Sequence, residues 1–271
     1  MSKQKTSSCN GCDFYSESNL KKMGLDISNV DYVVALAGNP NTGKSTVFNA
    51  LTGLRQHTGN WPGKTIARAE GGFSYNEKKY KLIDLPGTYS LLSYSQDEEI
   101  ARDFILFGKP DVTVIIVDAS RLKRNLNLVL QILEITDKAV LCLNLIDEAK
   151  RHNISIDIRI LSKDLGIPVV ETSARYGKGI PELLATIHKV ASGEIICKPH
   201  HIKSISKQLE KTVNKLVRQL EEEYPGLTNS RWIAFRLLEG DKKIMEAIRN
   251  DELSIIKSQK NGTVLEVANI V

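Results

Sequence analysis

Short apolar runs recur along the first two thirds of the chain, and each is separated from the next by a stretch with helical periodicity. The runs YVVALAG, VTVIIVD, AVLCLNLID and IPVVETS begin at residues 32, 112, 139 and 167. Runs of this length, rich in Val and Ile, are typical of parallel strands buried between two layers of helices. Helical stretches are expected at residues 45–53, 96–108, 124–136, 157–166 and 180–193. This alternation predicts a doubly wound α/β domain with a mostly parallel sheet.

One segment departs from the alternation. The sequence FSYNEKKYKLID, at residues 73–84, has two alternating stretches that meet at a polar NEKK turn. A pair of such stretches around a polar turn predicts a hairpin. We therefore expect one antiparallel strand at this side of the sheet.

After about Cys197 the strand pattern stops and only helical spacing remains. Residues 205–223 carry one apolar stripe with a charged opposite face, and 230–240 and the residues after Asp241 form two further helices. The first 30 residues are polar and lack a period. The pattern predicts three parts: a tail at 1–30, an α/β domain at 31–196 and an all-α domain at 197–271.

Composition narrows the class of protein without selecting a function. The chain has 37 Lys and Arg against 32 Asp and Glu, and 41% of its residues are hydrophobic, which excludes wholesale disorder. The apolar runs are far shorter than the roughly 18 to 20 residues of a membrane-spanning helix. Four Cys among 271 residues make no disulfide scaffold, so we expect a cytosolic chain. The net charge of +5 permits a nucleic acid or an anionic membrane as partner but requires neither.

The clearest candidate for chemistry directly follows the first predicted strand. GNPNTGKST, at residues 38–46, matches the G-x-x-x-x-G-K-[ST] loop at Gly38, Gly43, Lys44 and Ser45. In such a loop backbone N–H groups surround the β-phosphate, Lys44 reaches the β- and γ-oxygens, and the Ser45 hydroxyl coordinates Mg²⁺. The other residues assigned to the nucleotide here are Asn39, Pro40, Asn41, Thr42 and Thr46. The loop alone does not distinguish ATP from GTP.

Three later segments favour guanine, because they occur in order at the ends of successive predicted strands, where an open α/β sheet binds its ligands. In DLPG, Asp84 can hold a water of the Mg²⁺ shell and Gly87 can donate its N–H to the γ-phosphate. In NLID, Asp147 can accept hydrogen bonds from guanine N1 and N2, and Asn144 can brace the loop and the base. In TSA, a backbone N–H can reach guanine O6. The nucleotide-binding residues expected in these segments are Asp84, Leu85, Pro86, Gly87, Asn144, Leu145, Ile146, Asp147, Thr172, Ser173 and Ala174.

With these motifs the chain resembles the small GTPase superfamily. QHTGNWPGKT at 56–65, together with DLPGTYSLL and NLIDEA, looks like the cytosolic region of the ferrous iron transport protein B family, and RWIAFRLLEGD at 231–241 is similar to the helical part of that region. The resemblance covers about residues 31–250. It implies a P-loop GTPase (G-protein) fold, followed by an all-α helical domain, that binds GTP and GDP and regulates ferrous iron uptake.

The resemblance also implies a setting for the whole protein. A membrane permease would follow the C-terminus of this chain, which would lie at the cytoplasmic face of the inner membrane. Small cytosolic accessory proteins of iron transport are compatible partners.

Catalytic roles follow from the family pattern. The resemblance makes Thr65 the switch I threonine, with its hydroxyl on Mg²⁺ and Gly63 and Lys64 beside it at the nucleotide, and it makes Gly87 the switch II pivot. The residue after D-x-x-G, where many GTPases carry a water-positioning Gln, is Thr88. We therefore expect slow intrinsic hydrolysis. Two nearby arginines, Arg55 and Arg68, are expected to be solvated surface residues.

Asn41 suggests a substitute for an arginine finger. In potassium-activated GTPases an Asn at this position helps to bind a monovalent cation, and the family pattern adds backbone carbonyls of Gly59 and Trp61 in the switch loop. A K⁺ ion there would stabilise transition-state charge. The alternative is that Asn41 only makes a hydrogen bond within the loop.

Several other residues carry weaker expectations. Lys64 departs from the small apolar residue common in the family and is expected to face water, with tuning of the switch loop as the alternative. Trp61 is expected to be exposed and to report or gate nucleotide release. Cys142 is expected in the core. Cys9 and Cys12 form a C-x-x-C pair on the tail, which is compatible with disorder or with iron sensing but lacks the further ligands of a zinc site.

The helical domain has two interpretations. In the family it slows nucleotide release and leads to the membrane; in a ribosome- or RNA-associated GTPase it would bind RNA. It shows no G-x-x-G clamp and contains the acidic LEEEYPG, so no nucleic acid partner is expected. A regulatory switch without a transport partner is a third class.

Overall fold

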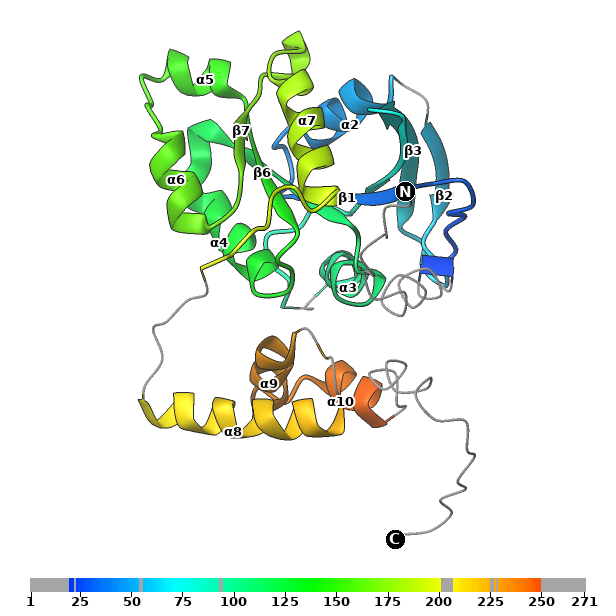
Figure 1. Ribbon diagram of the computed structural model, residues 1–271, viewed down its shortest axis with the longest axis vertical. Helices are drawn as coiled ribbons and strands as arrows, with labels where there is room; N and C mark the ends of the chain where they lie inside the picture. The colour runs from blue at the N-terminus through cyan, green and yellow to red at the C-terminus, as the bar shows by residue number, and fades with distance from the viewer. Residues whose placement is uncertain are drawn as a thin grey trace, which may run out of the picture. The chain divides into compact units, whose positions relative to one another are not determined.

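The computed structural model describes residues 20–21, 23–53, 56–92, 95–200, 207–224, 227 and 229–249. The chain divides into two compact units, Met1–Ile202 and Lys203–Val271. The first is an α/β unit, and the described elements of the second are all helices (Figure 1).

The described part of the first unit contains a seven-stranded sheet in the order β2-β3-β4-β1-β5-β6-β7. Strands β1, β4, β5, β6 and β7 run parallel, while β3 runs antiparallel to both β2 and β4. The sheet is therefore mostly parallel and doubly wound, as the sequence predicts. The strands are β1 (Tyr32–Gly38), β2 (Gln56–Asn60), β3 (Ala67–Tyr75), β4 (Lys78–Asp84), β5 (Val112–Asp118), β6 (Ala139–Asn144) and β7 (Val169–Glu171).

The helices of this unit follow the predicted stretches with two differences. The predicted helix at 96–108 is a helix, α3, that continues as a π-helix, Phe104–Gly108, and a short helix after β6, α5, was not predicted. The helices are α2 (Lys44–Thr52), α3 (Gln96–Asp103), α4 (Leu122–Leu133), α5 (Ile146–Arg151), α6 (Ile158–Leu165) and α7 (Ile180–Ala191), with 3₁₀ turns at Ala119–Arg121 and Ala174–Tyr176.

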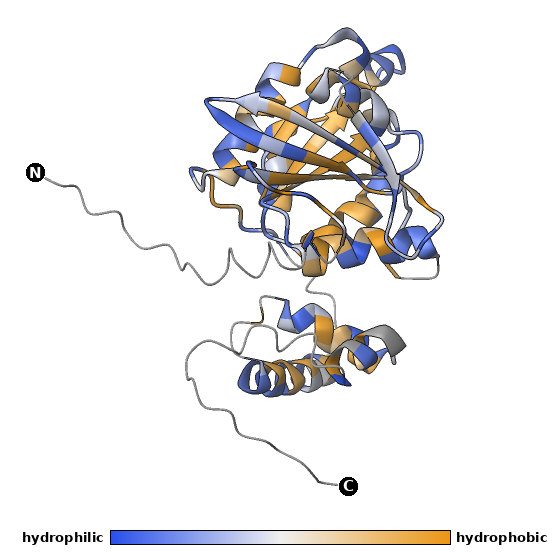
Figure 2. Ribbon diagram, turned by 90° about the vertical axis from the view of Figure 1, so that its right-hand side faces the viewer, coloured by the Kyte–Doolittle hydropathy of each residue, from blue (hydrophilic) through white to orange (hydrophobic). Residues whose placement is uncertain are grey.

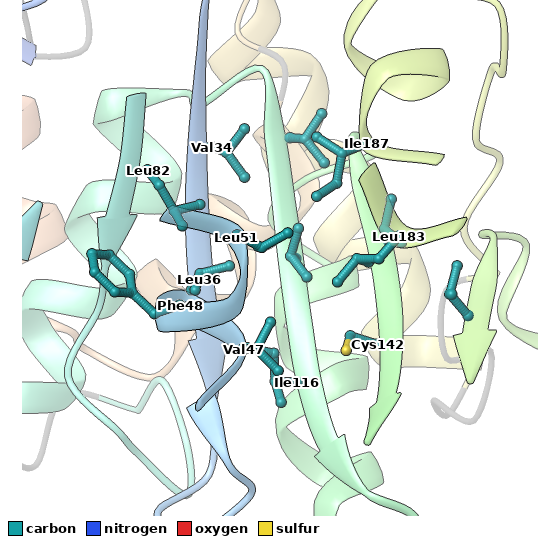
Figure 3. Close-up of a cluster of buried hydrophobic side chains, with 14 of the residues drawn as sticks. Val34, Leu36, Val47, Phe48, Leu51, Leu82, Ile116, Cys142, Leu183 and Ile187 are labelled. Atoms are coloured by element: carbon teal, nitrogen blue, oxygen red, sulfur yellow. The ribbon is translucent and has the colours of Figure 1, made fainter. Parts of the chain in front are cut away.

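The core lies on both faces of the central strands. Figure 3 shows Val34 and Leu36 of β1, Leu82 of β4 and Ile116 of β5 facing side chains of α2 and α7. The intervening strand residues, which point to the opposite face, are buried as well, and α4 contacts β5 and β1 there. Apolar residues accordingly concentrate in the strands (Figure 2). Each fully buried aliphatic side chain contributes about 1.5–3 kcal/mol, so this core fixes the strand ends that carry the predicted motifs.

The predicted hairpin is confirmed, with a tighter turn. Asn76 and Glu77 have φ values of 49° and 62° and connect β3 to β4 directly, the two-residue connection whose twist matches that of the strands. The structure also contains an edge strand, β2, that the pattern did not predict, because its sequence QHTGN has no alternation of apolar and polar residues.

Tyr80 of β4 joins the hairpin to α7. Its ring stacks on Phe73 at 4.6 Å between centroids, and its hydroxyl lies 2.6 Å from His188 Nδ1. Burial is the main cause that raises the pKa of Tyr80 to about 12, and the neighbouring Tyr32 adds to it. The folded protein therefore holds this proton more tightly than the unfolded chain, whose tyrosines ionise near pH 10.

We expect this difference to appear as an alkaline loss of stability. Because the folded pKa is raised, the contribution of Tyr80 is complete below about pH 10 and is lost as pH rises towards 12. Urea unfolding of the wild type and of Tyr80→Phe between pH 8 and 11.5 should show a smaller alkaline slope in the variant. Tyr176→Phe, at an exposed tyrosine, is the control. Equal slopes for the wild type and Tyr80→Phe would contradict the assignment.

The second unit contains α8 (Lys207–Glu223), α9 (Ser230–Leu238) and α10 (Lys242–Arg249). Trp232 is buried, and Arg231 donates to both carboxylate oxygens of Glu210 at 2.9 and 3.1 Å, which ties α9 to α8. No helix in the described part of the chain has the length and apolar character needed to cross a membrane.

Candidate functional site

The predicted motifs meet at one edge of the sheet. Gly38, Asp84 and Asn144 are the last residues of the parallel strands β1, β4 and β6, and Thr172 follows β7. In the register of the sheet Asp84 lies beside Leu36 of β1. The carboxyl edge is where an open parallel sheet offers backbone and side-chain groups to a ligand.

The phosphate loop is shaped by its glycines and closed by Thr42. Gly43 has a φ of 81°, and a Cβ there would collide with Asn144 Nδ2. A Cβ on Gly38 would lie 2.5 Å from the carbonyl oxygen of Ile116. Thr42, which is buried, donates from its hydroxyl to the carbonyl of Asn39 over 2.9 Å. The chain then enters α2 at Lys44, so the N-terminus of this helix faces the space outside the sheet edge.

Lys44 forms an ion pair with Asp84 across the site. The two side chains are only 13% and 17% exposed. Burial raises the pKa of Asp84, and the attraction of Lys44 opposes this rise. The pair therefore joins the predicted phosphate-binding cation to the predicted Mg²⁺-shell carboxylate, whereas Ser45 and Thr46 at the start of α2 are exposed.

The D-x-x-G segment packs directly on the phosphate loop. The N–H groups of Leu85 and Thr88 donate to the carbonyls of Leu36 and Gly38 at 3.0 and 3.3 Å. A Cβ on Gly87 would lie 3.4 Å from the backbone nitrogen of Pro40. Leu85 and Thr88 are buried, and Pro86 and Gly87 are half-buried. The two segments thus form one wall of the site.

Asn144 links the phosphate loop to the segments predicted to hold the base. Its side chain is 1% exposed, and its Nδ2 donates to the carbonyl of Thr42 over 3.0 Å. Its Oδ1 accepts from the Thr172 hydroxyl at 3.0 Å and from the Ala174 N–H at 3.1 Å. The predicted bracing of the loop is therefore present, and the amide is committed to the protein on both sides.

Asp147 lies just beyond this amide. Leu145, at a φ of 60°, turns the chain sharply before α5, whose residues include Ile146 and Asp147. The Asp147 N–H donates to Ser173 Oγ over 3.3 Å, which joins the NLID and TSA segments.

The predicted N–H for a base oxygen is not free in this structure. The amides of Thr172, Ser173 and Ala174 donate to Leu143 O, Lys178 O and Asn144 Oδ1. A base oxygen would have to share or replace one of these bonds.

The residues predicted for switch I lie in the connection between β2 and β3, and β3 is two strands away from β1. Thr65 is exposed there, and Gly63 has a φ of 67°. Gly59 is part of β2, paired with Arg68, rather than part of the loop as expected. The carbonyl of Trp61 accepts from the Lys64 N–H at 3.0 Å. Asn41, exposed on the phosphate loop at a φ of 65°, is the third predicted K⁺ ligand.

Three expectations about this region are wrong. Trp61 is 5% exposed and packs edge to face on Phe104, because the apolar surface of the π-helix lies beside it. Lys64 is not simply a solvated residue: its side chain is 25% exposed and pairs with Glu99 at 3.0 Å. Arg68 is 9% exposed and pairs with Glu70. Phe104 and Glu99, and the carbonyls of Met23 and Gly24 that Arg68 contacts, are distant in sequence, so spacing gave no signal for them.

Other predictions have simpler outcomes. Cys142 is fully buried, as predicted. Cys9, Cys12 and Arg55 lie outside the described residues. Within the described residues, no group of three or more His, Cys, Asp or Glu side chains could hold a metal ion.

Models of known protein families match both units of the chain. The family model for ferrous iron transport protein B matches residues 32–187, and that for the FeoB cytosolic helical domain matches residues 206–266. The chain belongs to the ferrous iron transport protein B family. The Fe(2+) transporter FeoB of Escherichia coli K12 is 41% identical over 212 residues, which are 77% of this chain and 27% of that protein. The chain thus spans little more than a quarter of the length of this curated relative.

Solved structures of the family have the same fold. The cytosolic domain of L. pneumophila FeoB matches with a TM-score of 0.74 and 34% identity over 84% of this chain and 90% of that one. The cytosolic domain of T. maritima FeoB in a GDP form matches with a TM-score of 0.74 and 38% identity over 85% and 88%. The same T. maritima domain in a GMPPNP form matches with a TM-score of 0.73. The predicted G-protein fold followed by a helical domain is confirmed.

Proposed function

We propose that this chain binds guanine nucleotides and hydrolyses GTP to GDP and phosphate as the cytosolic part of a ferrous iron transporter. The observation that carries the proposal is Asn144, which joins the phosphate loop to the NLID and TSA segments through three hydrogen bonds. Because the Asn144 amide supports both the predicted phosphate site and the predicted base site, the two sites together would hold a whole nucleotide. The T. maritima relative, solved in GDP and GMPPNP forms, supports this ligand.

Guanine would be selected by Asp147. A carboxylate accepts two hydrogen bonds, and guanine donates two in the matching geometry from N1 and N2, whereas adenine has no donor at either position. The carboxylate lies on the first turn of α5 and is half-buried, so its hydrogen bonds to a guanine base would be partly shielded from water.

The oxygen donors of the site fit Mg²⁺, a hard cation that prefers oxygen ligands and keeps several waters. The Ser45 and Thr65 hydroxyls would coordinate it, and Asp84 would hold one of its waters. Bound Mg²⁺ would neutralise charge on the β- and γ-phosphates. Lys44 pairs with Asp84 across the site, so its ammonium would reach the same phosphates, and Gly87, which packs on the phosphate loop, would donate its N–H to the γ-phosphate.

Hydrolysis would be slow without a further cation. Thr88, which follows the D-x-x-G segment, is buried, and its hydroxyl cannot act as a general base towards water. A K⁺ ion held by the Asn41 side chain and by carbonyls of Gly59 and Trp61 would supply positive charge in the transition state. The Trp61 carbonyl also accepts from the Lys64 N–H; because a carbonyl oxygen has two lone pairs, it could keep this bond while it coordinates K⁺, so cation binding would reinforce the shape of the loop.

The first test measures nucleotide affinity and hydrolysis in K⁺ and in Na⁺. We expect binding of GDP and GTP but not of ATP, and hydrolysis at least tenfold faster in K⁺. Asn41→Ala should remove the K⁺ effect and leave GDP affinity within about threefold of the wild type. Equal rates in the two salts would refute the K⁺ site alone, and tight ATP binding would refute the function.

In the whole transporter, switch loops ordered by the γ-phosphate and released after hydrolysis would regulate iron uptake at the cytoplasmic membrane face. The membrane permease and small accessory proteins would be partners, and the helical unit would slow GDP release. Uptake of labelled Fe²⁺ by the whole transporter, with and without Lys44→Ala, tests this role; unchanged uptake in the variant would refute it.

A further inference from the structure

The connection between β2 and β3 is a closed turn. The Trp61 N–H donates to the Ile66 carbonyl, and the Lys64 N–H donates to the Trp61 carbonyl, each over 3.0 Å. Gly63 takes the left-handed conformation that the turn requires. We call residues 61–66 the switch I turn; its backbone hydrogen bonds hold its shape.

Contacts of Trp61 and of Arg68, which follows the turn closely, fix the start of the switch I turn. Trp61 packs on Phe104 with 5.6 Å between ring centroids, and the Arg68 guanidinium lies 5.4 Å from the indole. Arg68 also donates to the carbonyls of Met23 and Gly24 at 2.7 and 2.9 Å. The start of the turn is therefore linked, through Trp61 and Arg68, both to the π-helix and to the segment that precedes β1.

Lys64, within the turn, makes a separate contact with α3. The Lys64 ammonium lies 3.0 Å from Glu99 Oε1, with the two side chains 25% and 16% exposed. Glu99 belongs to α3, which follows the D-x-x-G segment in the chain. Solvent screens a partly buried ion pair less than it screens an exposed one. The contact is therefore suited to hold the switch I turn against α3, the helix that follows the predicted switch II segment.

We propose that Lys64 and Glu99 are positioning residues for GTP hydrolysis, because their ion pair fixes the switch I turn on α3 and thereby places the adjacent Thr65. The inference rests on the proposed function, in which Thr65 binds Mg²⁺ beside the γ-phosphate. A turn that is already held loses less conformational entropy when it closes on a ligand. The pair should therefore favour a nucleotide with a γ-phosphate and be indifferent to GDP.

The test compares GDP, a non-hydrolysable GTP analogue and single-turnover hydrolysis in Lys64→Met, Glu99→Gln and the charge reversal K64E/E99K. Each single variant should weaken the analogue and slow hydrolysis by about 3- to 10-fold and leave GDP affinity within about twofold. The reversal should restore the analogue affinity. Lys78→Met is the matched control, because it breaks the 2.8 Å pair with Asp31 at the far end of β4.

The outcomes separate this inference from the proposed function. Equal losses for GDP and the analogue would indicate a merely structural pair and overturn the inference, as would unchanged affinities. Single variants that lose affinity without restoration by the reversal would overturn the pairing. A wild type that binds neither GTP nor its analogue would instead overturn the proposed function and this inference with it.

Discussion

Asp147→Asn is expected to convert a guanine-binding site into one that prefers xanthine. The carboxylate accepts hydrogen bonds from guanine N1–H and the N2 amino group, whereas the amide of Asn offers one donor where an acceptor is needed. Xanthine carries an oxygen in place of the N2 amino group, and that oxygen accepts from the Asn amide. Asp147→Asn removes one hydrogen bond to guanine and brings two donors into contact. We therefore expect a 10²- to 10³-fold loss of GDP affinity.

Competition with a fluorescent nucleotide measures both arms of this prediction. GDP should bind weakly to Asp147→Asn, and xanthosine diphosphate should bind at least tenfold more tightly than GDP. Glu148→Gln is the neighbouring control, because Glu148 is spent on an exposed pair with Arg151 at 2.7 Å; its GDP affinity should stay within about twofold. A loss of all nucleotides in Asp147→Asn, without a switch in preference, would argue against base recognition by this residue.

Local patterns were sufficient for much of the fold and for the rigid part of the site. Buried parallel strands such as β1 and β5 are read from their own apolar runs, and the phosphate loop is fixed by Gly38 and Gly43, whose backbone needs are local. The convergence of Asp84 and Asn144 also follows, because both end parallel strands of one sheet. These predictions needed only the alternation of strand and helix and the short motifs at the strand ends.

The switch I region could not be predicted in the same way. The partners of Lys64 and Trp61 are Glu99 and Phe104, which lie more than thirty residues further along the chain. The described side chains of edge strand β2, at residues 57–60, are all exposed, so no burial imposes alternation on them. Burial of Arg68 depends on carbonyls of the segment before β1. Such contacts depend on tertiary packing, so a charged or aromatic residue in this loop reads as exposed until the fold is known.

Asn144→Ala is expected to be the most destabilising single change at the site. The side chain is buried and makes three hydrogen bonds, to Thr42 O, Thr172 Oγ1 and the Ala174 N–H. Removing it leaves these groups without that partner in a dry environment, at about 1 kcal/mol or more each. We expect a loss of about 3 kcal/mol in the free energy of unfolding of the first unit, together with weaker binding of every nucleotide.

Urea unfolding in a Trp232→Phe background measures this loss, because the remaining tryptophan, Trp61, then reports the first unit alone. Asn127→Ala, at an exposed position of α4, is the control and should change stability by less than about 0.5 kcal/mol. Asn144→Asp separates the two sides of the amide: it keeps the acceptor for Thr172 and Ala174 but turns the donor towards Thr42 into a second oxygen. If the link to the phosphate loop carries nucleotide affinity, Asn144→Asp should lose as much affinity as Asn144→Ala. Wild-type affinity in Asn144→Asp would show that the phosphate loop holds its shape without this bond.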